Sequence, residues 1–437
     1  MAAIVVIVGR PNVGKSTFFN RLSKSRDALV DDSPGVTRDL LYASVHYDGV
    51  SFSLVDTGGV DEGVKDPLLK KVRDHVERVI EVADAVLFMV DAREGVMPGD
   101  HDIADILRRS QKKVYLATNK IDGPEHEHLM PEFYRLGVKT IYPVSASHGY
   151  GIRTLMDDIV KDLPENEIEI EDDGRIRVAV VGRPNVGKSS LINRALGTDR
   201  LLVSEQPGTT RDAVDTPFNY LGKDYILIDT AGMRRKARVR DKIDNLSMIK
   251  ALRSLDRCHV ALIMLDAERG VSEQDARICG YAFEKGRALV LAVNKWDLIK
   301  GDPEKRKFMD NAIDRQLQFI HFVPRINISA LTGERVMKTF EKINLVYGQF
   351  CRRFSTPAVN KAMQDMIARH PPHRSGSGKG RLKFFYATQA GVRPPTFVLF
   401  VNKPTMIHFS YKRFLLNQLR TQFPIENIPI RIKFKKK

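Results

Sequence analysis

The chain has 437 residues, of which 43% are hydrophobic and 28% are charged. This composition is ordinary for a globular protein and excludes a disordered, collagen-like or disulfide-knotted chain, while the length suggests about three domains. The net charge is +16, and residues 346–437 carry 18 Lys and Arg against two acids, Asp365 and Glu426. This last segment is therefore expected to attract a polyanion.

Simple sequence features also argue against a membrane or a secreted protein. No apolar run approaches the ~20 residues that span a bilayer. The apolar start at residues 1–8 lacks the basic leader and cleavage site of a signal peptide, so we expect a buried strand there. Cys258, Cys279 and Cys351 are far apart and predict neither a disulfide framework nor a zinc site, which fits a cytoplasmic location.

Five sequence blocks occur twice in the same order, the first three at an offset of 173 residues. The first copies are Gly9-Arg10-Pro11-Asn12-Val13-Gly14-Lys15-Ser16, residues 34–39, Asp56-Thr57-Gly58-Gly59, Asn119-Lys120-Ile121-Asp122 and Ser145-Ala146. The second copies are Gly182-Arg183-Pro184-Asn185-Val186-Gly187-Lys188-Ser189, residues 207–212, Asp229-Thr230-Ala231-Gly232, Asn294-Lys295-Trp296-Asp297 and Ser329-Ala330. This order and spacing predict a duplicated domain, and the period is too long for a solenoid.

Short apolar runs end just before the motifs in each repeat. They cover residues 4–8, 85–90 and 114–117 in the first repeat, and 178–181, 260–265 and 288–293 in the second. Such runs are typical of strands buried on both faces of a parallel sheet, whose C-terminal ends bind ligands. Each repeat is therefore predicted to be an α/β domain, with a mostly parallel sheet flanked by helices.

The domain limits follow from the repeats and from a charged stretch between them. Residues 164–174 are acidic and self-repelling, which predicts an extended linker. The predicted domains are then 1–163, 175–346 and 347–437. The last one has the pattern helix-strand-strand-helix-strand, with helical spacing at 359–367 and 414–423 and strands at 382–387, 396–401 and 428–434. We expect its aromatic residues to belong to the core rather than to a base-stacking platform.

The first block of each repeat has the phosphate-binding pattern G-x-x-x-x-G-K-S directly after an apolar run. The glycines let the backbone wrap a phosphate, and the following helix N-terminus adds positive potential. Lys15 and Lys188 are expected to reach the β- and γ-phosphates of a nucleoside triphosphate. Two matches at one fixed offset make a chance occurrence negligible.

The middle blocks predict a Mg²⁺ site and a sensor of the γ-phosphate. Ser16, Asp56 and Thr37, and likewise Ser189, Asp229 and Thr210, are the expected metal ligands, the threonine only while the γ-phosphate is present. Thr209 is a less favoured choice than Thr210. Gly59 and Gly232 are expected to donate a backbone N–H to the γ-phosphate, and Val60 and Met233 follow them in the nucleotide-binding segment. The predicted catalytic residues are Lys15, Thr37, Gly59, Lys188, Thr210 and Gly232.

The N-K-x-D blocks predict guanine as the base. A carboxylate at Asp122 or Asp297 can accept hydrogen bonds from guanine N1–H and its N2 amine, a donor pair that adenine lacks. Asn119 and Asn294 are expected to tie the base loop to the phosphate loop, with the stems of Lys120 and Lys295 along the base. The Ser145-Ala146 and Ser329-Ala330 pairs are expected to offer a backbone N–H to guanine O6.

With these motifs in view, the whole chain resembles the family of bacterial tandem GTPases called Der or EngA. The resemblance covers both repeats and the basic C-terminal segment, for which it implies a KH-like fold. It implies GTP hydrolysis, a role in assembly of the large ribosomal subunit, and contact with ribosomal RNA. The expected molecule is cytoplasmic and monomeric when free.

The residue after each D-x-x-G motif is Val60 or Met233, where Ras-like enzymes place a water-positioning glutamine. The resemblance implies a GTPase in which K⁺, held with the help of Asn12 or Asn185, supplies positive charge near the transferred phosphate. The alternative is that these asparagines only cap the loop.

Three questions stay open at this stage. The C-terminal segment has no G-x-x-G motif, which argues against ordinary KH-type single-strand binding and favours electrostatic docking on structured RNA or on the neighbouring domain. Because Val60 and Met233 are hydrophobic, a second alternative stays open: a nucleotide-gated RNA-binding scaffold in which one site binds GTP without hydrolysing it. A signalling or tRNA-modifying GTPase is a third alternative, against which the lack of a catalytic Cys or metal cluster argues.

Overall fold

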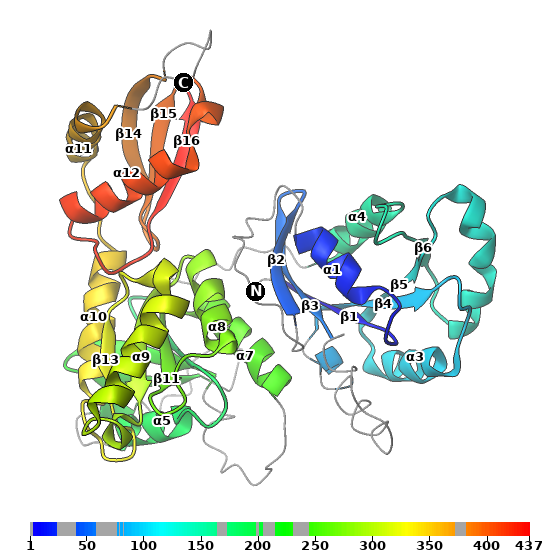
Figure 1. The fold of residues 1–437 in the computed structure, drawn as a ribbon, viewed down its shortest axis with the longest axis horizontal. Helices are drawn as coiled ribbons and strands as arrows, with labels where there is room; N and C mark the ends of the chain where they lie inside the picture. Colours follow the sequence, from blue (N-terminus) through cyan, green and yellow to red (C-terminus); the bar gives the residue numbers. More distant parts are fainter. Residues whose placement is uncertain are drawn as a thin grey trace. The chain divides into compact units, whose positions relative to one another are not determined.

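The two repeats form two sheets, and the C-terminal segment forms a third (Figure 1). The computed structural model describes residues 3–23, 41–57, 77, 79–81, 83–163, 173–197, 201–203, 215–229, 244–371 and 382–437. The chain divides into two compact units, Met1–Glu169 with Ile243–Ile249, and Ile170–Lys242 with Lys250–Lys437. The second repeat and the C-terminal segment thus share one unit. The domain limits derived from the sequence stay predictions.

The first sheet has the strand order β2-β3-β1-β4-β5-β6, with only β2 antiparallel to its neighbour. The strands are β1 (Ala3–Val8), β2 (Leu41–Tyr47), β3 (Val50–Asp56), β4 (Ala85–Asp91), β5 (Lys113–Asn119) and β6 (Ile141–Pro143). The helices are α1 (Lys15–Ser23), α3 (Pro98–Ser110) and α4 (Ile152–Asp162), with short 3₁₀ turns η2 (Pro124–Leu129) and η3 (Pro131–Leu136).

Both faces of this sheet are covered, which explains the continuous apolar runs. Along β1, Val5 and Ile7 pack in a core with residues of α1 and α4. Ile4 and Val6 pack in a second core with residues of α3. Alternate side chains of a strand point to opposite faces, so a strand between two helical layers must be apolar at every position. Figure 1 shows the helices on the two sides of the sheet.

The second repeat builds the same arrangement with one more strand, in the order β13-β12-β11-β7-β10-β9-β8. The strands are β7 (Ile176–Val181), β8 (Leu201–Val203), β9 (Thr216–Tyr220), β10 (Lys223–Ile228), β11 (Val260–Asp266), β12 (Ala288–Asn294) and β13 (Arg325–Asn327). The helices are α5 (Lys188–Leu196), α7 (Asp244–Arg257), α8 (Glu273–Glu284), α9 (Pro303–Gln316) and α10 (Lys338–Phe350), with 3₁₀ turns η4 (Trp296–Leu298) and η5 (Gln318–Ile320).

The C-terminal segment has the predicted order helix-strand-strand-helix-strand. Its elements are α11 (Thr356–Arg369), β14 (Phe384–Gly391), β15 (Thr396–Val401), 3₁₀ turn η6 (Pro404–Met406), α12 (Phe409–Gln422) and β16 (Arg431–Lys436). Central β15 pairs antiparallel with β14 and parallel with β16. Two boundaries were predicted too early: β14 begins at Phe384 and runs to Gly391, and Ile428 and Ile430 precede β16.

The expectation that the aromatic residues of this segment are core is only partly right. Phe397 is fully buried, whereas Phe385 and Tyr386 are 44% and 43% exposed. The reason is that helices cover one face of the sheet only. Ala387, Leu399 and Phe434 belong to or pack against the core, while Tyr386 and Phe400 alternate with them on the opposite face.

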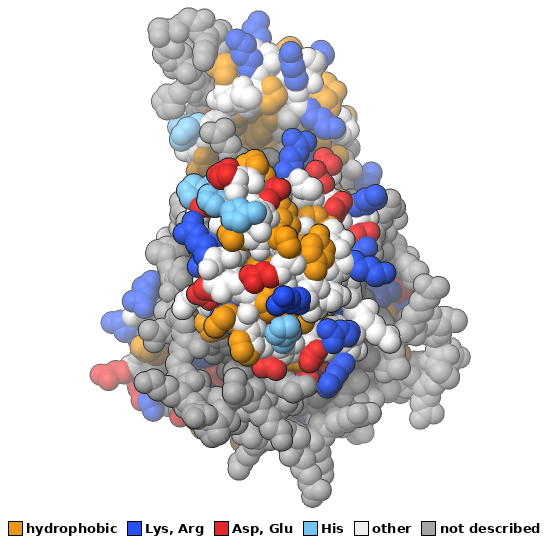
Figure 2. Space-filling view, turned by 90° about the vertical axis from the view of Figure 1, so that its right-hand side faces the viewer, with side chains coloured by type: hydrophobic (Ala, Val, Ile, Leu, Met, Phe, Trp, Pro, Cys, Tyr) orange, Lys and Arg blue, Asp and Glu red, His pale blue; other side chains and the backbone are white. Residues whose placement is uncertain are grey.

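The charge pattern of the first unit differs from that of the C-terminal segment. Figure 2 shows a face of the first unit on which Lys and Arg side chains are interspersed with Asp and Glu, so that neither sign forms a continuous patch. Residues 1–160 hold 20 Lys and Arg against 24 Asp and Glu. Within the described residues, no helix is long and apolar enough to cross a membrane.

Candidate nucleotide-binding sites

Parallel strands bring the predicted motifs of each repeat to one edge of its sheet. In the first sheet Ile7 pairs with Asp56, and Asp91 pairs with Asn119. In the second, Asp266 pairs with Asn294 in the same way. The loops that follow these strand ends carry the phosphate-binding and N-K-x-D blocks, as expected for ligand sites of open α/β sheets.

The two phosphate-binding loops have the same internal geometry. Lys15 Nζ donates to the carbonyl oxygens of Gly9 and Arg10, each at 2.7 Å. Lys188 Nζ donates to those of Gly182 and Arg183, also at 2.7 Å. The ammonium group is thus held against the loop that it is predicted to serve. Burial lowers the pKa of Lys188 to about 8, because a buried ammonium loses hydration.

A side-chain amide joins the phosphate loop to the base loop in each repeat. Asn119 Nδ2 donates to Val13 O at 2.7 Å, and its Oδ1 accepts from Ala146 N at 2.9 Å. Asn294 makes the matching bonds to Val186 O and Ala330 N at 2.7 and 2.8 Å. The predicted tie between the two loops is therefore present in both sites, and it also includes the Ser-Ala pair of each repeat.

Gly14 is required by this joint. Its φ is +98°, and a Cβ atom there would lie 2.2 Å from Asn119 Nδ2. Gly187 has a φ of +101°, and its Cβ would lie 2.3 Å from Asn294 Nδ2. The motif glycine thus provides both a left-handed backbone and the space in which the amide reaches the loop.

The joint also engages the backbone of the Ser-Ala pairs. Ala146 N and Ala330 N donate to the asparagines, and Ser145 N and Ser329 N donate to Tyr150 O and Glu334 O at 3.0 and 3.1 Å. All four N–H groups have partners inside the protein, and their donation to guanine O6 stays a prediction. Ser147, the next residue, also lines the cavity of the first site, although it lies outside the motif.

The base-recognition loop lines a cavity of about 310 Å³ in the first site. The lining residues are Asn12, Gly14, Thr17, Arg93, Asn119, Lys120, Asp122, Ala146, Ser147 and His148. Lys120 forms an ion pair with Asp91, and Lys295 Nζ lies 2.5 Å from Asp266 Oδ2. These carboxylates end the preceding strand and fix the position of each lysine, whose predicted contact with the base stays a prediction.

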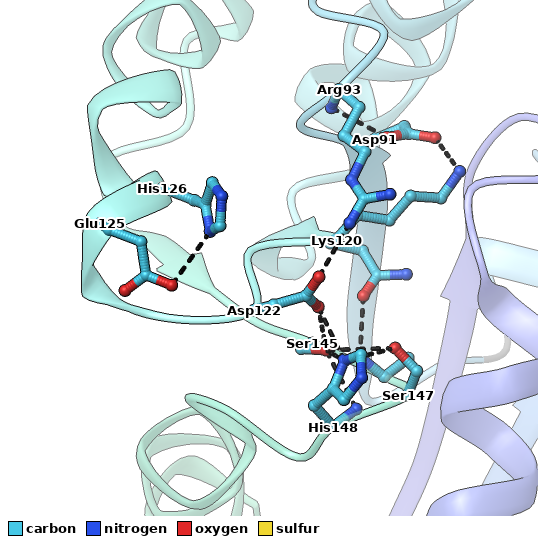
Figure 3. A network of polar contacts seen from close by, with 11 residues as sticks. Asp91, Arg93, Lys120, Asp122, Glu125, His126, Ser145, Ser147 and His148 are labelled. Carbon is cyan, nitrogen blue, oxygen red and sulfur yellow. Dashed lines mark hydrogen bonds and ion pairs between the residues drawn. The ribbon is translucent and has the colours of Figure 1, made fainter.

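The carboxylates predicted to recognise guanine differ between the sites. Asp122 accepts hydrogen bonds from Arg93, Ser145 and His148 (Figure 3). The bonds from Ser145 and then His148 hold the pKa of Asp122 below its usual range. Asp297 Oδ1, by contrast, is buried and has no hydrogen-bond partner among the described residues. An orphaned buried acceptor of this kind fits a donor supplied by a ligand.

The predicted metal ligands also differ. Ser16 Oγ donates to Asp56 Oδ2 at 2.9 Å, so two hard oxygen ligands converge at the start of α1. These oxygens fit Mg²⁺, which takes one or two carboxylates and otherwise binds water and phosphate. Consistent with such a sparse site, the described residues contain no cluster of three or more potential metal-ligating His, Cys, Asp or Glu.

In the second site, Asp229 lies among other groups. Its N–H donates to Asp215 Oδ1 at 3.1 Å, and Arg257 lies 2.5 Å from the other oxygen of Asp215. Burial raises the pKa of Asp229, against the opposing effects of Lys250 and a hydrogen bond from Ser254. Ser189 is exposed at the start of α5, and no hydrogen bond joins it to Asp229 within the described part of the chain.

In each phosphate loop, the arginine side chain pairs with a neighbouring helix rather than with its own loop. Arg10 Nε lies 2.9 Å from Asp100, and Arg183 Nε lies 2.8 Å from Asp275; both carboxylates are fully buried. These arginine side chains therefore anchor the loops to α3 and α8.

Asn12 and Asn185 have φ values of +65° and +61°, which gives asparagine a backbone reason to occupy this position. Neither amide makes a hydrogen bond to another described residue, and the choice between K⁺ binding and loop capping stays open.

Several predicted site residues lie outside the described residues: Thr37, Gly58, Gly59, Val60, Thr210, Thr230, Ala231, Gly232 and Met233. Their roles stay predictions. Pro11, Ile121, Pro184 and Trp296 lie in the described loops beside the residues above, where they complete the motifs.

Comparison with known proteins decides the family. The family model described as "50S ribosome-binding GTPase" matches residues 4–120 and 177–295, and the one described as "KH-domain-like of EngA bacterial GTPase enzymes, C-terminal" matches residues 353–435. GTPase Der of Caldanaerobacter subterraneus is 48% identical over 100% of this chain and 99% of its own. That of Syntrophobacter fumaroxidans is 48% identical over 99% and 98%.

The chain belongs to the GTPase Der (EngA) family. It therefore binds GTP and hydrolyses it, and its third domain is KH-like. Among solved structures, Era of Aquifex aeolicus bound to GDP·AlF4⁻ is 19% identical, with a TM-score of 0.30, over 60% of this chain and 92% of its own. The Der relatives match both repeats and the KH-like domain.

Proposed function

We propose that this GTPase docks on a precursor of the large ribosomal subunit, through ribosomal RNA, under the control of its bound nucleotides. Both repeats match the family model of 50S ribosome-binding GTPases, which supports a ribosomal partner. The observation that carries the RNA contact is the open face of the KH-like sheet, because its lysines and aromatic rings suit a nucleic acid.

On this open face, residues stand in register across three strands. Tyr386, Phe400 and Lys435 form one row, and Thr388, Val398 and Lys433 form the next, in which Val398 is buried between its neighbours while Lys433 is exposed. The rings of Tyr386 and Phe400 stack at 4.2 Å, and Lys437 Nζ lies 4.9 Å from the ring centroid of Phe385. Lysines bind phosphates, and exposed rings stack on bases in a sequence-tolerant way.

The KH-like domain is packed on the second GTPase domain, which supports a coupling between nucleotide and RNA contact. Arg431 Nη2 donates to Glu284 O at 2.9 Å. Asn427 Nδ2 donates to Phe322 O at 3.1 Å, and Gln349 Oε1 accepts from Asn427 N at 2.9 Å. The hydrophobic core also runs without a break between the two domains. A change in the second GTPase domain would thus reach the RNA-binding face through a packed interface.

For the reaction itself, the residues above take the following roles. Lys15 and Lys188 hold the β- and γ-phosphates, and Asp122 and Asp297 orient guanine. Ser16 with Asp56 would hold Mg²⁺, as would Ser189 with Asp229 after rearrangement of that carboxylate. The metal ion supplies charge neutralisation between the phosphates. K⁺ near Asn12 or Asn185 would add positive charge where no glutamine is present.

The predicted metal ligands differ between the two sites, which favours a second candidate function in which the two sites divide the work. In it, one site turns GTP over and the other mainly binds it. Lys15→Ala and Lys188→Ala, each in the full chain, separate these possibilities by their residual turnover. Equal loss from both variants would argue against such a division.

The docking proposal is tested by capturing ribosomal particles with the full chain in GDP, GTP or a non-hydrolysable analogue, over a series of salt concentrations. Lys433→Gln with Lys435→Gln should lower the slope of log affinity against log salt by about 1 to 2. Lys361→Gln with Arg413→Gln removes the same charge from α11 and α12 and should leave the slope unchanged. Equal slopes in both double variants would contradict docking through the sheet face.

A further inference from the structure

The carboxylate of Asp122 has more partners than guanine recognition allows. An ionised carboxylate accepts about four hydrogen bonds. Arg93 Nη2 donates to Oδ2 at 2.8 Å, while Ser145 Oγ and His148 Nδ1 donate to Oδ1 at 2.7 and 2.9 Å. Guanine N1–H and N2 would add two donors. Because three and two exceed four, at least one protein donor must leave when guanine binds.

Burial shows which donors can leave. Ser145 is fully buried. The side chains of Arg93 and His148 are 63% and 66% exposed, and both line the cavity that the base-recognition loop borders. Figure 3 shows Arg93 and His148 reaching Asp122 from different sides. These two side chains can swing into solvent at little cost, whereas Ser145 cannot.

The second site makes matching turn hydrogen bonds but has Glu268 and Thr332 in place of Arg93 and His148. Arg93 N donates to Asp91 Oδ1 at 2.9 Å, and the matching Glu268 N donates to Asp266 Oδ1 at 3.0 Å. His148 N donates to Ser145 Oγ at 3.0 Å, and the matching Thr332 N donates to Ser329 Oγ at 3.1 Å. The two turns are therefore held by the same hydrogen bonds, and they differ in the side chains that they carry. Asp297 Oδ1 has no described partner.

We propose that Arg93 and His148 form a latch on Asp122, which guanine must displace and which makes nucleotide binding at the first site weaker than at the second. The proposal rests on the guanine-recognition role of Asp122. It assigns specificity and exchange control at the first site to two residues outside the shared motifs.

The direction of the bonds follows from the charge of Asp122. Because an ionised carboxylate only accepts, His148 donates through Nδ1. Other charged groups around the loop are engaged: Lys120 with Asp91, Arg21 with Ala146 O and Ser147 O, His126 with Glu125, and Glu127 with Tyr150. Arg93 and His148 are therefore the exposed donors that guanine has to displace.

The test uses the full chain and a fluorescent GDP analogue. Asp297→Asn removes guanine binding from the second site, so the analogue reports the first; Asp122→Asn reports the second. Titrations at a single pH compare each variant of the first site with the same chain carrying Arg93 and His148.

Variants locate the effect. In the Asp297→Asn chain, His148→Gln and Arg93→Gln should each tighten binding at the first site, Arg93→Gln by about twofold to fivefold, the range of an exposed ion pair. Glu268→Arg with Thr332→His should install the latch in the second site. Weaker or unchanged binding by His148→Gln and Arg93→Gln would overturn the proposal. If Asp122→Asn, added to the Asp297→Asn chain, leaves guanine binding at full affinity, the assigned role of Asp122 fails instead.

Discussion

At the residue scale, each site depends on a few side chains whose protonation and hydrogen bonds are defined by the fold. The two lysines bind loop carbonyls in the same way, but the carboxylates around them have different partners. Two sites with nearly identical motifs are therefore expected to differ in metal handling and in base affinity. Three predictions test this scale directly.

The first concerns the base. Asp297→Asn replaces an acceptor by an amide that can donate to xanthine O2, so the second site should change its preference from guanine to xanthine nucleotides. Sites that match polar groups discriminate by about 10⁴ to 10⁵. Competition between GTP and XTP in the full chain measures the change, and undiminished GTP binding by this site would contradict the guanine assignment.

The second concerns Lys188, whose pKa lies at about 8. At pH 8 about half of this amine is neutral, and a bound phosphate should restore its charge. GTP binding by a Lys15→Ala chain should therefore take up a proton at pH 8 and weaken as the pH rises from 7 to 8.5. Calorimetry in buffers of different ionisation enthalpy counts the proton. Equal heats in all buffers would show that Lys188 is already charged.

The third concerns K⁺. Because Val60 and Met233 cannot orient water, we predict that hydrolysis rises when K⁺ replaces Na⁺ at constant ionic strength. Asn12→Asp keeps an oxygen ligand and should keep the response, whereas Asn12→Gly keeps the left-handed backbone and should blunt it. Phosphate release by each chain is the measurement, and equal rates in the two salts would remove K⁺ from the mechanism.

At the scale of elements, strand order and loop geometry place the motifs, and much of this was predictable. Buried strands, the P-loops and the asparagine joint follow from apolar runs and motif spacing. The engaged N–H of Ala146 was not predictable, because a backbone donor carries no sequence signal. Nor were Arg93 and His148, which lie outside any motif and reach Asp122 only through the β4 and β6 loops. The exposure of Tyr386 depends on which sheet face the helices cover.

A glycine pair tests the loop geometry. Gly14→Ala should abolish nucleotide binding at the first site, because its Cβ would lie 2.2 Å from Asn119 Nδ2. Gly49→Ala is the matched control: Gly49 has a φ of +82° with nothing within 4 Å of the added Cβ. Both should lower the free energy of unfolding by about 1 kcal/mol through backbone strain. Only Gly14→Ala should lose affinity for GDP, and equal affinity loss would refute the steric argument.

At the scale of the whole molecule, the second GTPase domain and the KH-like domain share a core and an interface of hydrogen bonds. Arg420 lies over the ring of Phe322 at 4.1 Å, beside the bonds of Asn427. Burial lowers the pKa of Arg420 to about 10, which reflects how far this interface excludes water. The pair should therefore unfold as one cooperative body.

Asn427→Ala tests this coupling. It removes the bonds to Phe322 O and from Gln349 Nε2, and leaving these groups unpaired should cost about 1 to 3 kcal/mol. Hydrogen exchange should rise at the interface in both domains, while the first unit stays protected. Asn417→Ala on α12 serves as a control on the same domain. Faster exchange confined to the KH-like domain would show that the two domains unfold independently.

The amide joint of Asn119 and Asn294 also limits how a duplicated enzyme can evolve. One side chain holds the phosphate loop, the base loop and the following turn together, so a change in any one of them disturbs the other two. Binding of guanosine and of pyrophosphate cannot be tuned separately through these positions. The two copies are free to diverge only at side chains outside the joint, such as Arg93 and Glu268, which lie two residues after the strand-ending Asp91 and Asp266. Specialisation of one copy is thereby confined to the rim of the pocket, where it can adjust exchange without altering which nucleotide is chosen.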